Sequence, residues 1–111
     1  MLDTINDHFI VCGYGRIGRM VSREFGRQQI PYVVVERNGE RVQMAMEDGA
    51  LAVEADASDE RVLERVGIKR ARGLIAAVGS DAENVYAVMT ARTLRGDLFI
   101  IGRAESDDAT R

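Results

Sequence analysis

Cysteine, histidine, proline and tryptophan are scarce in this chain of 111 residues. It contains one cysteine and one histidine, together with one proline and no tryptophan. A lone cysteine excludes an internal disulfide framework and fits a reducing cytosol. His8 and Cys12 stand at the two ends of one predicted strand, roughly 13 Å apart, so they cannot share an ion. The sequence therefore predicts no metal site, and one histidine at a strand start gives no credible serine–histidine–acid triad.

Long apolar runs and a surplus of positive charge are missing as well. No apolar run approaches the ~18 residues that suggest a membrane span, and the N-terminus lacks the layout of a signal peptide. A net charge of −3 and 5% aromatic residues provide neither a basic field nor a stacking platform for nucleic acid. With 46% hydrophobic residues, residues 1–111 are expected to form a single cytoplasmic domain with one core.

Strand-like apolar runs alternate with helix-forming segments along the chain. Strands are predicted at residues 8–12, 32–35, 50–54, 73–78 and 98–101, and helices between them are predicted to begin at Arg16 and after the caps Asn38, Ser58 and Ser80. The strand runs are mostly continuous, as expected when helices cover both faces of a sheet. With right-handed crossovers, this order predicts an α/β fold with a doubly wound, Rossmann-like parallel sheet of about five strands in the order 3-2-1-4-5.

A glycine-rich turn follows the first predicted strand and reads Gly13-Tyr14-Gly15-Arg16-Ile17-Gly18. In such a motif the first glycine allows the tight turn, the second lets the backbone approach a pyrophosphate, and the third permits close helix–sheet packing. The N-terminus of the following helix offers unpaired N–H groups to phosphate oxygens. Because the motif stands between a strand and a helix, it favours a nucleotide-binding loop over a plain glycine turn.

A carboxylate ends the second predicted strand, at Glu36. It can accept hydrogen bonds from both hydroxyls of a ribose. Its charge would repel a 2′-phosphate, so NADP is disfavoured relative to NAD. Arg37 is the neighbouring residue that could reverse this preference. The alternative is that Arg37 is an ordinary loop cation exposed to solvent.

Catalytic groups for a dehydrogenase are not evident. Tyr86 lacks the lysine four positions later that a short-chain dehydrogenase needs, because Thr90 stands there. A dehydrogenase also needs a second domain for its substrate and its catalytic acid or base. We therefore expect no enzymatic activity, and the alternative is the nucleotide-binding fragment of an NAD-dependent dehydrogenase.

Several motifs together resemble one family. They are "VCGYGRIG", "YVVVERN", "EADASDE", "LIAAVGSDAENV" and "IIGRAES". In combination they resemble the N-terminal domain of the RCK/KTN (TrkA-N) family, the cytoplasmic regulatory domains of potassium channels and transporters. The third motif departs from the family's usual Gly-Asp-Ala turn at Glu54-Ala55, and the last has Gly102 where the family's strand end has alanine.

The resemblance implies a role for each matching position. Arg16 and Arg103 would neutralise phosphates, Glu36 would bind the ribose, and Asp56 and Ala57 would line the adenine end. The segment Val78-Gly79-Ser80 would pass over the ligand, and Asp81 and Asn84 begin the next helix, where helix capping is an equally good explanation. Some relatives sense calcium near the fifth strand; Glu105 matches one such position, but Arg103 occupies another, so no metal site is expected.

The implied function is that of a ligand-sensing regulatory domain. It would bind NAD(H) or ADP, ATP or AMP and control a potassium channel or transporter, whose membrane subunit or domain would be its partner at the inner face of the membrane. The family's fuller domain continues through a further strand and a dimerisation helix, so this chain is expected to be either truncated after its fifth strand or a minimal variant of the domain. In a full-length protein the domain would form homo-oligomers, from dimers to octameric rings.

Overall fold

The computed structural model describes residues 2–102. Five strands are present: β1 (Phe9–Cys12), β2 (Tyr32–Glu36), β3 (Leu51–Glu54), β4 (Gly73–Ala76) and β5 (Phe99–Gly102). They alternate with the helices α1 (Arg16–Arg27), α2 (Gly39–Glu47), α3 (Glu60–Arg65) and α4 (Asp81–Leu94), and a short 3₁₀ helix, η1 (Ile68–Arg70), follows α3.

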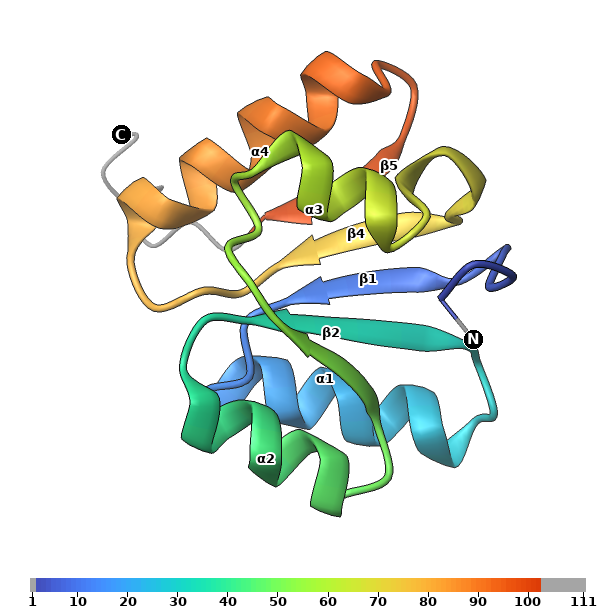
Figure 1. Ribbon diagram of the computed structural model, residues 1–111, viewed down its shortest axis with the longest axis vertical. Helices are drawn as coiled ribbons and strands as arrows, with labels where there is room; N and C mark the ends of the chain where they lie inside the picture. The colour runs from blue at the N-terminus through green and yellow to red at the C-terminus, as the bar shows by residue number, and fades with distance from the viewer. Residues whose placement is uncertain (1, 103–111) are drawn as a thin grey trace.

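The strands form one parallel sheet in the order β3-β2-β1-β4-β5 (Figure 1). Within it β1 pairs with both β2 and β4, so that Cys12 lies beside Val35 on one side and Ala76 on the other. The predicted strand order and the Rossmann-like fold class are therefore confirmed. The order reverses between β1 and β4, and in such sheets ligands bind beyond the carboxyl ends of the strands at this point.

Two apolar clusters cover the two faces of the sheet. On one face, Val11 and Val34 lie under α1 and α2, and the partly buried Val21 and Phe25 of α1 pack against them. On the other, Ile10 and Val33 pack with Leu63 of α3 and Ala87 of α4 in the larger cluster. The central strands are thus buried on both sides, which explains their continuous apolar sequences.

Side-chain caps fix where three of the helices begin. Asn38 and Ser80 cap α2 and α4 as predicted, because their side-chain oxygens accept from the backbone N–H groups of Arg41 and Glu83. The predicted cap at Ser58 is wrong: Asp59 caps α3. Ser58 instead donates both its backbone N–H and its hydroxyl to the Asp56 carboxylate, at 2.9 and 2.7 Å.

The last two strands also differ slightly from prediction. β4 ends at Ala76 rather than 78, and the Ala77 N–H still donates to the carbonyl of Cys12 at 2.8 Å. Beyond Ala77 the chain turns towards α4, and the Val78 N–H is taken by a side chain of that helix rather than by a strand. β5 covers residues 99–102 instead of 98–101. Arg103 and Glu105 lie outside the described residues.

Candidate functional site

A cleft of about 730 Å³ opens at the carboxyl ends of the central strands. Most candidate residues from the sequence line it: Gly13, Tyr14, Gly15, Arg16, Ile17, Glu36, Arg37, Asp56, Ala57, Val78 and Gly79. Gly18 lies beneath it in the first turn of α1, and Arg103 is outside the described residues. One cleft thus brings together segments from four loops that are far apart in the chain.

The glycine loop (residues 13–18) is packed so closely that two of its glycines cannot be replaced. Gly13 has a φ of +105°, and a Cβ there would lie 2.3 Å from the carbonyl oxygen of Ala77. A Cβ on Gly18 would lie 2.0 Å from the carbonyl oxygen of Gly13. Gly15 is different, because its nearest neighbour is the guanidinium of Arg41 at 3.7 Å. This is an ordinary van der Waals distance to a flexible side chain, so the middle glycine lacks the crowding of the other two, as the approach of a phosphate requires.

Glu36 joins the glycine loop to the loop that follows β2. Its side chain is buried, with the residue 8% exposed. One carboxylate oxygen accepts from the backbone N–H of Tyr14 at 2.6 Å, and the other accepts from the N–H of Asn38 at 2.8 Å. A carboxylate offers about four acceptor positions, so each oxygen retains one for a ribose hydroxyl. These contacts fix the position of the group that the sequence predicts to bind the ribose.

Tyr14 lines the cleft, but its hydroxyl is committed elsewhere. The phenol oxygen donates to Asp48, at the end of α2, at 2.5 Å, and Arg19 pairs with the same carboxylate at 3.0 Å. Burial, together with the hydrogen bond to Asp48, raises the pKa of Tyr14 to about 12. The hydrogen bonds from Tyr14 and Arg19 lower the pKa of Asp48. Tyr14 thus ties the glycine loop to both Glu36 and α2.

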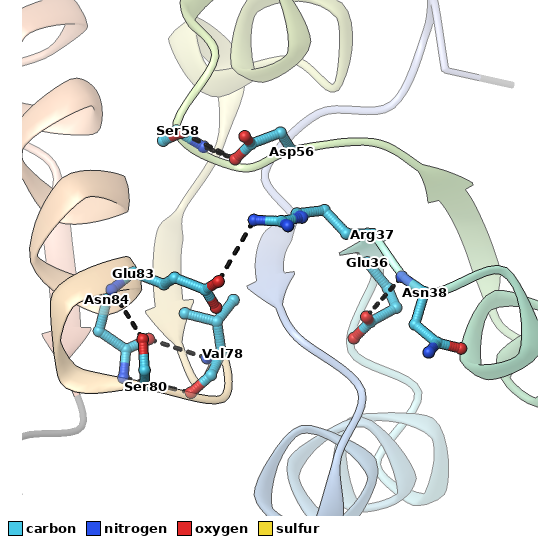
Figure 2. A network of polar contacts seen from close by, with 9 residues as sticks. All are labelled: Glu36, Arg37, Asn38, Asp56, Ser58, Val78, Ser80, Glu83 and Asn84. Carbon is cyan, nitrogen blue, oxygen red and sulfur yellow. Dashed lines mark hydrogen bonds and ion pairs between the residues drawn. The ribbon is translucent and has the colours of Figure 1, made fainter.

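Across the cleft, one side chain holds the β4–α4 loop (residues 77–80). Asn84 is 3% exposed, and its Oδ1 accepts from the backbone N–H of Val78 at 2.8 Å (Figure 2). Ser80 is the N-cap of α4, so helix capping does not account for Asn84. Gly79 is exposed, and a Cβ on it would have no neighbouring atom within 4 Å. This loop is therefore anchored at Val78 and open at Gly79.

Asp56 and Arg37 lie at the end of the cleft that the resemblance assigns to adenine. The pKa of Asp56 is lowered, first by the backbone N–H of Ser58, then by the Ser58 hydroxyl, and also by the charge of Arg37. Arg37 extends from the end of β2 across the cleft, where its Nη1 lies 3.2 Å from Oε2 of Glu83 (Figure 2). This ion pair joins β2 to the first turn of α4.

Among the described residues, two charged side chains that line the cleft, Arg41 and Glu83, are missed by sequence reasoning. The sequence indicates Glu83 only as part of a capping box, although a glutamate at the third helical position can also reach sideways into a cleft. Arg41 belongs to no sequence motif. It reaches the cleft because α2 begins, at its cap, beside the glycine loop. Within residues 2–102, Arg16 and Arg41 form no side-chain ion pair, so two uncompensated cations lie beside the glycine loop.

Neither a metal cluster nor a membrane helix is found in the part of the chain that the structure describes. Residues 2–102 contain no group of three or more histidine, cysteine, aspartate or glutamate side chains placed to hold a metal ion. Every helix in this range is too short or too polar to cross a bilayer. Cys12 is buried, which raises the pKa of its thiol to about 12. Cys12 therefore acts as a small apolar residue of the core.

The TrkA-N domain family matches residues 9–111, nearly the whole chain. The chain belongs to this family. Potassium channel protein 1 of Methanocaldococcus jannaschii is 36% identical to this TrkA-N domain over 110 residues, which cover 95% of the chain and 33% of that protein. The Trk system potassium uptake protein TrkA homolog of Pyrococcus horikoshii is 33% identical over 97 residues, covering 86% of the chain and 42% of that protein. The TrkA-N domain thus spans less than half the length of these relatives, and the resemblance predicted from its motifs is confirmed.

Solved structures of the family share the fold. The TrkA-N domain of the inner membrane protein ybaL from Escherichia coli superposes with a TM-score of 0.86 at 32% identity, covering 95% of this chain and 78% of that one. The GsuK channel bound to NAD matches with a TM-score of 0.76 at 27% identity, over 85% of this chain and 17% of that one. GsuK bound to ADP matches with a TM-score of 0.73 at 26% identity, over 85% of this chain and 25% of that one.

Proposed function

We propose that this TrkA-N domain binds an adenine nucleotide and regulates a potassium channel or transporter without catalysing a reaction. The observation that carries this proposal is the cleft between the glycine loop and Glu36. We place a diphosphate beside Gly15, which lacks the crowding of Gly13 and Gly18, and Arg16 and Arg41 of the cleft lining supply positive charge there. Glu36 is held by two backbone N–H groups, and we place the ribose hydroxyls against its carboxylate.

The ligand class is an adenine nucleotide, namely NAD(H), ADP, ATP or AMP, which all share an adenosine joined to phosphate. Two structures of one relative support it, because GsuK is bound to NAD in one and to ADP in the other. In our proposal the diphosphate lies against the N-terminus of α1, where helix N–H groups and the dipole favour anions. The adenine lies between Arg37 and Ala57, and Val78 and Gly79 cover the far end of the ligand.

Regulation would act through α4, the helix to which the cleft is connected. The β4–α4 loop and Glu83 join the cleft to α4, so a ligand that contacts them can favour one position of this helix over another. We further propose that the domain acts at the cytoplasmic face of the membrane, as part of a homo-oligomer that contacts the pore protein. Relatives named as potassium channel and potassium uptake proteins support this assignment.

A thermal-shift panel tests the proposal. NAD, NADH, ADP and ATP at millimolar concentration should raise the melting temperature, because a ligand that binds only the native state stabilises it by mass action. NADH absorbance should stay constant in the presence of simple carbonyl substrates. The absence of any shift would refute nucleotide binding. Steady oxidation of NADH would instead favour the dehydrogenase-fragment alternative.

A further inference from the structure

Three arginines within residues 2–102 line the cleft, and they differ in whether a carboxylate is paired with them. Arg16 and Arg41, at the glycine-loop end, carry no side-chain ion pair within residues 2–102, so their charges are available to a phosphate. Arg37, at the Glu36 end, is paired with Glu83 at 3.2 Å. Its charge also acts on Asp56. The cleft is therefore prepared for phosphates at one end, while the cation at the other end is already compensated.

The backbone around Glu83 holds its carboxylate in position to pair with Arg37. Glu83 is the third residue of α4, and its N–H donates to the Oγ of the cap residue Ser80 at 3.1 Å. The reciprocal capping bond would turn the carboxylate back towards Ser80. Instead the side chain extends over the cleft to Arg37, as Figure 2 shows. Arg37 itself follows Glu36, which is held by the N–H groups of Tyr14 and Asn38.

We propose that Glu83 is a specificity-determining residue, which excludes 2′-phosphorylated nucleotides by keeping Arg37 in an ion pair across the cleft. The inference rests on the proposed function of nucleotide binding. A 2′-phosphate placed at Glu36 meets a carboxylate and needs a cation beside it, and Arg37 is the adjacent one. To take that role Arg37 must leave Glu83, and Glu83 then adds a second unpaired negative charge near the phosphate. Nucleotides with a free 2′-hydroxyl need no such rearrangement.

The test is the ratio of NADP to NAD affinity, measured by calorimetry on the whole chain. Glu83→Gln keeps the size of the side chain and removes its charge. It should shift the ratio about tenfold towards NADP, the effect expected when a charge-assisted hydrogen bond becomes available. The pair is exposed, with the two side chains 61% and 46% accessible, and such pairs add little to stability, so the variant should fold.

Two further variants separate this effect from a general change in charge. Glu40→Gln removes one negative charge from the exposed first turn of α2, outside the cleft lining, and should leave the ratio within about twofold of the original. In the double variant Glu83→Gln/Arg37→Gln the gain towards NADP should be lost, because it depends on the released guanidinium.

The outcomes distinguish this inference from the proposed function. If neither NAD nor ADP binds to the unmodified chain, the proposed function fails and the inference fails with it. If NAD binds and Glu83→Gln leaves the ratio unchanged, only the inference is overturned. It is also overturned if Glu40→Gln produces the same shift, or if the shift persists without Arg37. A tenfold shift that requires both Glu83→Gln and an intact Arg37 supports it.

Discussion

The two loops that face each other across the cleft are held in opposite ways. In the glycine loop, Gly13 and Gly18 lie so close to backbone carbonyls that a methyl group would fall within 2.3 Å of an oxygen. In the β4–α4 loop, a methyl group on Gly79 would have nothing within 4 Å, and the side chain of Asn84 secures the neighbouring Val78. The glycine loop is thus tightly constrained by packing, whereas the β4–α4 loop has room to adjust.

The largest expected effect of a substitution is in the tightly packed glycine loop. Gly18→Ala places a methyl group 2.0 Å from a backbone oxygen, so α1 must move away from the glycine loop. We expect the free energy of unfolding to fall by about 3 kcal/mol. Gly79→Ala is the matched control in the open loop and should change it by less than about 0.5 kcal/mol. Urea denaturation measures both, and equal losses would contradict the contrast between the two loops.

The next effect concerns the carboxylate that anchors the glycine loop. Glu36→Ala removes the acceptor proposed for the ribose hydroxyls, so the affinity for NAD or ADP should fall by at least ~10-fold in calorimetry. Glu54→Ala is the control, because Glu54 lies beside Glu36 in the sheet register but is exposed and outside the cleft lining. Undiminished affinity in Glu36→Ala would exclude the ribose-binding role.

A smaller effect is expected at the anchor of the open loop. Asn84→Ala leaves the N–H of Val78 without its acceptor, which should lower the free energy of unfolding by about 1 kcal/mol. Exchange of the Val78 amide with solvent should also become faster. Thr93→Ala, on the exposed surface of the same helix, should change neither quantity appreciably. If Val78 remains equally protected in Asn84→Ala, Asn84 is not the anchor.

The smallest effect lies at the amino end of the central strand β1, away from the cleft, and depends on pH. His8 is fully buried before β1, its Nε2 lies 2.8 Å from the carbonyl oxygen of Val66, and burial lowers its pKa below the ordinary value of 6.5. The unfolded chain therefore takes up a proton before the native one, so stability should fall as the pH decreases below 6.5. His8 is the only histidine. His8→Gln should reduce this dependence in thermal melts between about pH 7.5 and 5.5, and a melting temperature that rises on acidification would contradict the assignment.

The fold was predictable because its determinants are local. Continuous apolar strands, capping residues such as Asn38 and Ser80, and right-handed crossovers together indicate the strand order 3-2-1-4-5. The errors arose where two local options compete. Ser58 and Asp59 are both good caps, and the chain uses Asp59 because Ser58 is bonded to Asp56.

The site was predictable only where a motif fixes the backbone. The glycine loop and Glu36 have defined positions in a strand–loop–helix unit, and the structure places them on one cleft. Arg41 and Glu83 come from the starts of two other helices, and their arrival at the cleft depends on how those helices pack. Such placements follow from tertiary structure, so no periodicity or spacing in the sequence indicates them.

The most direct test of the account is to map NAD onto the chain by the amide chemical shifts of the ¹⁵N-labelled protein. Nucleotide binding in the cleft predicts saturable shifts concentrated at Gly13–Ile17, Glu36–Arg37 and Val78–Gly79, with the Tyr14 amide among the largest because it donates to Glu36. Amides on the outer surface of α2 should move little. Shifts confined to other surfaces, or none at millimolar NAD, would contradict the claim that this cleft is a nucleotide site.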